Sequence, residues 1–216
     1  MDLLELANQS GDKLTLKYCS IATLANYFLI GNSKKHDIGG LVTKFQKYGF
    51  VEPIKIDPSL NKGKGAIIGG NGRIEALLQM YESGMDAPRG IAIAEGIWLV
   101  PVIFGVNAKN EDEAIALSID LNWSVLEGGN FSALDATRLF DSDKLLEQLQ
   151  DLSTHDEMIT AIDNSDFGFL VEQLAQIENN KLDFQGNESI FDKDESTDEN
   201  RLKSKKNKCP NCDFEW

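Results

Sequence analysis

The 216-residue chain has few cysteines, no long apolar run and no basic segment at its start. Three cysteines do not suggest a disulfide framework, and two of them form a C-x-x-C pair, Cys209 and Cys212. No apolar run approaches the ~18 residues that a membrane helix needs, so we expect no membrane association. The first residues resemble no secretory signal, and we therefore expect a cytoplasmic protein.

Positive charge is missing from one long segment. Between Leu145 and Asn180 there is no lysine or arginine, although leucines recur there at helical spacing. A DNA-reading helix-turn-helix needs cations for phosphate and base contacts, so we expect these helices to pack or to dock a protein.

The net charge of −14 is unevenly distributed. Residues 12–73 hold ten lysines and arginines against four acids, whereas residues 111–199 hold four against twenty-three. The basic segment favours phosphate of a nucleotide or nucleic acid, and lysines solvated on loops are the equal alternative. The acidic segment would repel DNA.

A glycine-rich turn between an apolar strand and an amphipathic helix is the most informative feature. The segment AIIGGNGRIEALLQM spans residues 66–80. Its glycines let a ligand approach the backbone, the N–H groups at the helix start face an anion, and an arginine adds a forked cation. We predict a phosphate site formed by Gly69, Gly70, Asn71, Gly72 and Arg73. A plain strand–turn–helix connection with a solvated arginine is the alternative.

Other segments flank this turn in a characteristic order: Asn32 to Asp37 before a helix, Gly49-Phe50 and Pro53-Ile54 before a strand, Val100-Pro101-Val102 on a later strand, and an acidic helix ending near Asn122. In this order the chain resembles the ParB N-terminal, or ParB/sulfiredoxin-like, domain over roughly residues 14–125.

The turn separates the branches of that superfamily. Sulfiredoxins carry a nucleophilic cysteine where Asn71 stands, so we do not expect sulfiredoxin activity. Chromosome-segregation ParB proteins hold CTP and magnesium with Gly-Glu-Arg-Arg, and here Asn71 and Gly72 replace the acid and the first arginine. The match is closest to ParB-like proteins of phages and mobile elements, which are often encoded beside DNA methyltransferases.

The resemblance implies a module that binds a nucleotide or nucleic-acid phosphate and serves as a regulatory or accessory protein of DNA-modifying machinery. The nucleotide would be CTP or ATP with Mg²⁺. Contact with DNA would run through a partner such as a DNA methyltransferase, and a homodimer is a further expectation. The alternative is an enzyme: a CTP or ATP hydrolase, a phosphoryl-transfer enzyme or a nuclease.

Catalysis of phosphoryl transfer needs metal-bound acids and a positioned nucleophile. The candidates are Glu52, Glu75, His36 and Asp37. Two solvated acids, together with an exposed His36 beside a helix-capping Asp37, are the alternative. The resemblance adds Lys34, Lys35 and Asn122 as ligand contacts, although the arginine that usually follows the family's asparagine is missing here.

Periodicity predicts an α/β (α+β) fold, a small mixed sheet with helices. The expected organisation is an N-terminal helix (1–12), a ParB/sulfiredoxin-like domain (13–125), a helical extension (126–180), a disordered charged linker (181–208) and the C-x-x-C tail (209–216). Expected strands cover 13–18, 54–56, 66–68 and 98–106. Expected helices cover 2–8, 38–48 and 74–81, with further helices after 111, around 145–152 and before Asn179. Residues 57–65 and 83–96 are expected to be loops.

The tail has the spacing of half a zinc knuckle. Two thiolates leave a tetrahedral Zn²⁺ ion half coordinated, so Cys209 and Cys212 would need ligands from a second chain, a partner, or Cys19, His36 or His155. A redox pair or an idle dithiol is the alternative.

Overall fold

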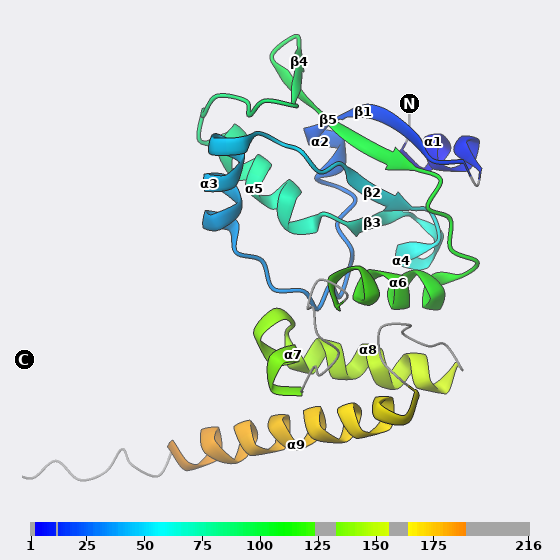
Figure 1. Cartoon of the computed structure of the whole chain (residues 1–216), viewed down its shortest axis with the longest axis vertical. Helices are drawn as coiled ribbons and strands as arrows, with labels where there is room; N and C mark the ends of the chain where they lie inside the picture. The colour runs from blue at the N-terminus through cyan, green and yellow to red at the C-terminus, as the bar shows by residue number, and fades with distance from the viewer. Residues whose placement is uncertain (1–2, 12, 124–132, 156–163, 189–216) are drawn as a thin grey trace, which may run out of the picture. The chain divides into compact units, whose positions relative to one another are not determined.

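The computed structural model describes residues 3–11, 13–123, 133–155 and 164–188. The strands are β1 (Thr15–Ser20), β2 (Ile54–Asp57), β3 (Ala66–Gly69), β4 (Ala92–Ala94) and β5 (Ile97–Phe104) (Figure 1). The helices are α1 (Leu3–Ser10), α2 (Ile21–Leu24), α3 (Ile38–Tyr48), α4 (Leu60–Gly63), α5 (Asn71–Glu82), α6 (Glu111–Trp123), α7 (Ala133–Leu139), α8 (Ser142–Thr154) and α9 (Asn164–Glu188).

The five strands form one mixed sheet in the order β1-β5-β2-β3, with β4 paired to the start of β5. Strand β2 runs parallel to β5, and the other pairs are antiparallel. The predicted α/β class with a small mixed sheet is therefore confirmed. The most apolar strand, β5, has three neighbours and contributes four buried residues to the largest core cluster.

Helices α3 and α5 lie beside each other on one face of the sheet (Figure 1), where they enclose the largest core cluster together with α1 and α2. On the other face, α6 packs against β3. Leu16 and Tyr18 of β1, and Leu14 just before it, face solvent, with exposed fractions of 57%, 52% and 69%.

Helix α3 shows how local sequence fixes an element. The Asp37 carboxylate accepts a hydrogen bond from the Gly40 N–H at 2.9 Å, and Gly49 ends the helix with a φ of 83°. Both ends agree with the sequence, because Asp is a preferred N-cap and Gly tolerates the left-handed region. The predicted inner face is only partly right: Phe45 is buried, but Tyr48 is 53% exposed.

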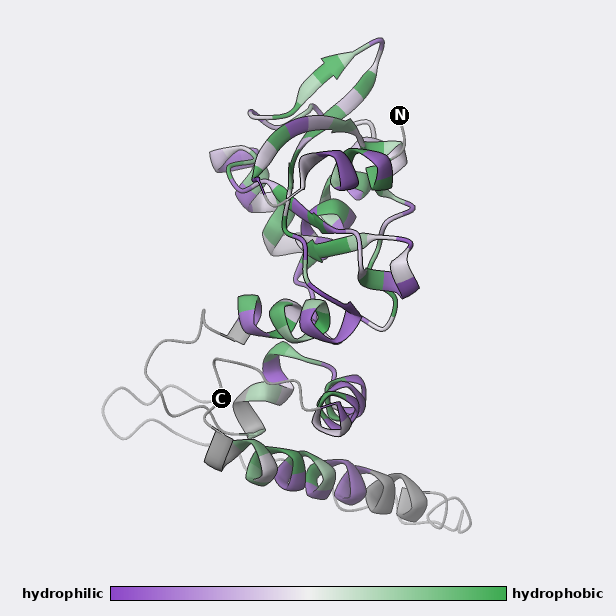
Figure 2. Ribbon diagram, turned by 90° about the vertical axis from the view of Figure 1, so that its right-hand side faces the viewer, coloured by the Kyte–Doolittle hydropathy of each residue, from purple (hydrophilic) through white to green (hydrophobic). Residues whose placement is uncertain are grey.

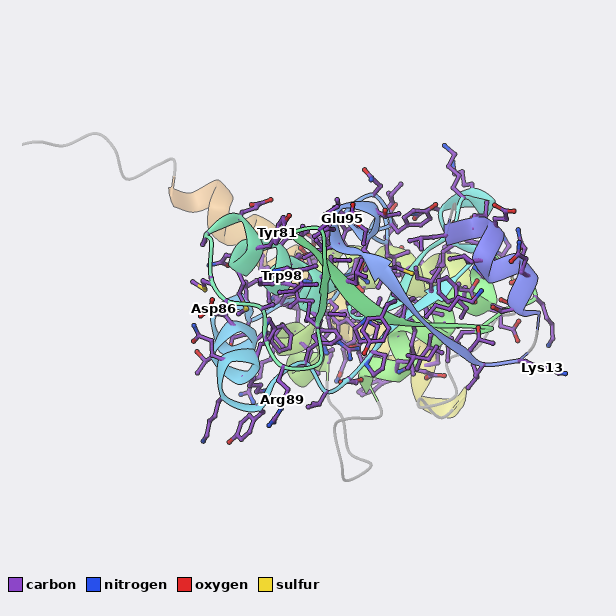
Figure 3. All side chains as sticks on the ribbon, turned by 90° about the horizontal axis from the view of Figure 1, so that it is seen from above. Lys13, Tyr81, Asp86, Arg89, Glu95 and Trp98 are labelled. Atoms are coloured by element: carbon purple, nitrogen blue, oxygen red, sulfur yellow. The ribbon has the colours of Figure 1, made fainter. Side chains whose placement is uncertain are left out.

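Two short elements occur where loops were predicted. In α4, Asn61 and Lys62 adopt left-handed conformations, with φ of 55° and 59°. Strand β4 has three exposed residues and forms a hairpin with β5. Near this hairpin Tyr81 of α5 packs edge-on against Trp98, with ring centroids 5.3 Å apart (Figure 3).

The later helices build their own core with part of α6. Leu145, Leu149 and Leu152 of α8 are buried there beside Leu170 and Leu174 of α9, as their spacing predicts. Phe169 was expected on the same stripe, but it is 60% exposed. Figure 2 shows how hydrophobic and hydrophilic residues alternate along α9.

Helix α9 continues past Asn179 to Glu188, so it ends later than predicted and includes the start of the expected linker. Residues 189–216, with the rest of that linker and the tail, lie outside the described residues. Among the residues that the structure does describe, no helix has the length and apolar character of a membrane span.

Candidate functional site

A cavity of about 290 Å³ lies at the glycine-rich turn. It is bounded by the loop before α3, the start of β2, the turn between β3 and α5, and the last turns of α6. Its lining residues are Asn32, Lys34, His36, Leu41, Glu52, Lys55, Ile68, Gly69, Gly70, Asn71, Gly72, Arg73, Ser118, Leu121 and Asn122.

The turn has the predicted strand–glycine–helix geometry. Gly70 adopts a φ of 114°, and α5 begins at Asn71. Among the described residues no side chain caps the start of α5. The N–H groups of Asn71, Gly72 and Arg73 have no acceptor within the helix and carry the positive end of its dipole, so this wall of the cavity favours an anion.

Both ends of the Asn71 side-chain amide form hydrogen bonds with the protein backbone. It is 7% exposed, its Oδ1 accepts a hydrogen bond from the Leu29 N–H at 3.1 Å, and its Nδ2 donates to the Ile67 carbonyl at 2.9 Å. These bonds fasten the turn to the loop before α3. Any contribution of Asn71 to anion binding therefore comes from its backbone N–H.

Arg73 is held between the turn and β2. Its Nη1 donates to the Glu52 carbonyl oxygen at 2.8 Å and pairs with the Glu52 carboxylate at 2.9 Å. The Arg73 side chain is only 14% exposed, whereas that of Glu52 is 66% exposed. Burial lowers the pKa of Arg73, and the Glu52 charge opposes part of that shift. A phosphate entering the cavity would compete with a solvent-exposed carboxylate for a mostly buried cation.

His36 lies in a hydrogen-bonded chain. Its Nδ1 is 3.0 Å from the Glu75 Oε2, and its Nε2 is 3.3 Å from the Asn32 Nδ2. The Asn32 Oδ1 accepts a hydrogen bond from the Lys34 N–H, so the Asn32 amide nitrogen is the end that faces His36. With Glu75 accepting the Nδ1 proton, Nε2 is the acceptor on the cavity side.

Gly72 leaves room for the His36 ring. A Cβ atom at Gly72 would lie 2.7 Å from His36 Cγ, so any larger residue displaces the imidazole. The histidine side chain is 15% exposed, and it therefore differs from the exposed histidine of the alternative interpretation. Asp37 does cap α3, as that interpretation held, and it is not among the cavity residues.

The adjacent lysines have different surroundings. Lys34 lines the cavity, lies 5.8 Å from the centre of the Phe140 ring, and has a pKa lowered by burial. Lys35 does not line the cavity, because its Nζ donates to the Thr137 carbonyl oxygen at 2.8 Å. The structure thus places Lys34 at the site and Lys35 against α7.

Helix α6 closes the cavity on the side of Ser118, Leu121 and Asn122. Asn122 lies where the sequence predicts a ligand contact, with its Nδ2 donating to the Ser118 carbonyl oxygen at 2.7 Å. Its Oδ1 keeps an acceptor function that suits a ligand donor.

Sequence reasoning did not assign Lys55 to the site. Strand pairing sets Lys55 opposite Gly69, and its side chain lies near that glycine. The alternation Ile54-Lys55-Ile56 was the available signal, since it turns the lysine to the face opposite the buried isoleucines. Among the described residues, three cations and one carboxylate therefore line the cavity, in a protein whose net charge is −14.

The acids offer a limited magnesium site. Glu52 is paired with Arg73 and Glu75 with His36, and among the described residues no group of three metal ligands occurs at the cavity. Two glutamates suffice for Mg²⁺ only where the phosphates of a nucleotide supply most of the other ligands. Cys209 and Cys212 lie outside the described residues.

No protein-family model matches the chain, and no curated protein or solved structure is significantly similar to it.

Proposed function

We propose that the chain is a phosphate-binding module that takes a nucleotide, or a phosphate of a nucleic acid, at the turn Gly69–Arg73. The observation that carries the proposal is the convergence of Arg73, Lys34 and Lys55 on a cavity with the uncapped start of α5 in its wall. Cations and helix N–H groups at one point suit a bound phosphate, and the chain's overall negative charge does not account for them.

The volume of the cavity limits which part of a ligand it can enclose. A volume of about 290 Å³ is at the lower end for small-molecule sites, so the phosphate groups are enclosed and a base or sugar extends toward the open side. The proposed nucleotides are CTP and ATP, with Mg²⁺ held mainly by their phosphates and assisted by Glu52 or Glu75.

The ParB/sulfiredoxin-like fold belongs to the same proposal, supported by the order of sequence segments around the turn. It extends the proposal to a regulatory or accessory protein of a phage or mobile element, acting in the cytoplasm with DNA-modifying machinery such as a DNA methyltransferase. A homodimer completes this proposal.

Calorimetric titration of the full chain with CTP, ATP, GTP and a short oligonucleotide, with and without Mg²⁺, tests it. Arg73→Ala should weaken binding by about 10- to 150-fold, since a charge-assisted bidentate contact is worth roughly 1.5–3 kcal/mol. Lys55→Gln should weaken it less. Arg89→Ala, on the exposed loop before β4 (Figure 3), is the matched control: it loses a hydrogen bond to the Tyr48 carbonyl oxygen, away from the cavity, and should leave binding unchanged. Absence of binding by folded wild-type protein would refute the proposal.

A second function is favoured by the His36–Glu75 pair. Glu75 accepts the Nδ1 proton and fixes the tautomer in which Nε2 is an acceptor, and a water that replaces the Asn32 amide at Nε2 would give up its proton there. Beside a bound phosphate this is the arrangement of a general base for hydrolysis. The alternative function is therefore a CTP or ATP hydrolase, a phosphoryl-transfer enzyme or a nuclease.

Phosphate release from CTP, ATP and GTP, and cleavage of a labelled oligonucleotide, measure this activity. His36→Gln should lower turnover by about 10²- to 10⁴-fold while leaving nucleotide affinity nearly unchanged. Glu75→Gln should lower it less, because a glutamine still holds the ring in place although it no longer fixes the tautomer. Turnover that survives His36→Gln would remove the histidine from the mechanism.

A further inference from the structure

Three potential metal ligands meet at the junction of α6 and α8, away from the cavity. Asp112 belongs to the first turn of α6, Asp151 to the last turn of α8, and His155 is the C-cap of α8. One ligand atom from each residue lies within 4.8 Å of the other two. His155 Nδ1 and Asp112 Oδ2 are 3.2 Å apart.

The spacing suits coordination by a single ion. Bonds of about 2.0–2.2 Å at tetrahedral angles separate two ligand atoms by roughly 3.3–3.5 Å, close to the His155–Asp112 distance. Asp151 and His155 are four residues apart and therefore lie on one side of the end of α8. The set supplies one imidazole and two carboxylates, donors that zinc accepts, and leaves a position for water.

The three acidic residues in the first turn of α6 have different partners. Glu111 accepts a hydrogen bond from the Lys62 N–H at 2.9 Å, and Glu113 interacts with Lys109. Asp112 instead contacts α8 through His155 and is 29% exposed. Asp112 is thus the acid of this turn that is directed at a potential ligand of another helix.

The electrostatics favour a doubly charged ion. Two carboxylates lie beside the C-terminal end of α8, where the helix dipole is negative, and the positive start of α6 offsets only part of the Asp112 charge. A protonated imidazole supplies one positive charge against them, whereas a divalent cation with neutral imidazole balances both carboxylates.

We propose that Asp112, Asp151 and His155 bind a zinc ion, completed by water, which fastens the end of α8 to the start of α6. The helices already share a core, since Ala116 and Ile119 of α6 pack in one cluster with Leu145, Leu149 and Leu152 of α8. The ion would cross-link the polar ends of the same pair of helices. This proposal is independent of phosphate binding at the cavity.

Zinc titration of the full chain in a Cys209→Ser, Cys212→Ser background tests it, because that background removes the thiolates of the tail. One zinc ion per chain should bind. His155→Gln and Asp151→Asn should each weaken binding by at least about 10- to 100-fold, since even groups that only support ligands have effects of that size. Glu147→Gln, an exposed carboxylate one turn earlier on α8, is the matched control and should bind zinc like the parent.

A thermal measurement reports on the cross-link. At zinc concentrations near 100 times Kd, the midpoint of unfolding should rise by about 5–10 °C in the parent and in Glu147→Gln, but not in His155→Gln. Circular dichroism without zinc verifies that each variant is folded. Absence of zinc binding in the serine background, or equal binding by His155→Gln and the parent, would show that the cluster is only an ion pair.

Discussion

At the scale of single residues, the space around Gly72 determines the position of His36. Gly72→Ala should displace the imidazole, because the new Cβ would lie 2.7 Å from His36 Cγ. Higher helix propensity gains up to about 1 kcal/mol and crowding costs about 1–3 kcal/mol, so the free energy of unfolding should fall modestly. Imidazole nitrogen shifts in NMR spectra should report loss of the bond to Glu75.

The control for this substitution is Gly168→Ala on α9. Nothing lies within 4 Å of a Cβ atom at Gly168, so this variant should gain roughly 0.5–1 kcal/mol from helix propensity alone. Unchanged His36 signals in Gly72→Ala would contradict the close contact.

Cys19 should make the protein less stable in alkaline solution. Burial raises the pKa of the Cys19 thiol from 9.0 to about 11, with a small opposing effect of Lys17. Between these values the unfolded chain loses the proton first, so stability falls as the pH rises from about 9 to about 11. Cys19→Ala should remove this part of the pH dependence.

Chemical denaturation at pH 8, 9, 10 and 11 measures the effect. The difference between wild type and Cys19→Ala should shrink across that range, since only the wild type loses the contribution. A constant difference would show that the thiol is not protected by burial.

At the scale of elements, Asp57 joins the end of β2 to two loops. It is fully buried, and its carboxylate accepts hydrogen bonds from the Ser59 N–H, the Ser59 hydroxyl and the Ala108 N–H. Asp57→Ala should therefore lower the free energy of unfolding by about 3 kcal/mol, because these donors lose a charged acceptor inside the protein.

Urea denaturation of Asp57→Ala and of Asp86→Ala provides the comparison. Asp86 lies on the exposed loop between α5 and β4 (Figure 3), and its removal should change stability by less than about 0.5 kcal/mol. Similar losses in the two variants would mean that the Asp57 bonds add little.

The elements that the sequence predicts are those with local signals. The β3–α5 turn and the caps of α3 follow from glycines and Asp37 at the appropriate positions. Helix α4 was missed because it depends on contacts distant in sequence. The Asn61 side chain accepts a hydrogen bond from the Ile30 N–H and donates one to the Phe28 carbonyl oxygen. Strand β4 was missed because its three residues are too few to show a period, and because among the described strands it pairs with β5 alone.

The features of the cavity likewise fall into those with a local sequence signal and those set by contacts between distant segments. Its glycine turn and Arg73 are local in sequence, whereas the His36–Glu75 contact depends on how α5 packs against the loop before α3. Lys34 and Lys35 are adjacent and carry the same charge, so the sequence does not separate them. The hydrogen bonds of Lys35 with α7 turn it away and leave Lys34 at the cavity. Phosphate binding itself stays a prediction.

At the scale of the whole molecule, charge distribution sets the response to DNA. The chain carries −14 overall, and residues 145–180 contain no lysine or arginine. The chain alone should bind a random duplex no more tightly than about 10⁻⁶ M at ~150 mM salt, since non-specific affinities are about 10⁻⁴–10⁻⁶ M. A gel-shift titration measures this, and a submicromolar Kd would show that the basic segment 12–73 outweighs the acidic remainder of the chain.

The backbone pairing of residues 33–35 with residues 139–141 has a consequence for biosynthesis. The Lys35 N–H donates to the Leu139 carbonyl oxygen, and the Asp141 N–H donates to the Ser33 carbonyl oxygen. A chain emerging from the ribosome can pair all five strands before residues 139–141 are available. The loop with Asn32, Lys34 and His36 gains these backbone partners only afterwards. The cavity is therefore completed after the sheet whose strands β2 and β3 line it.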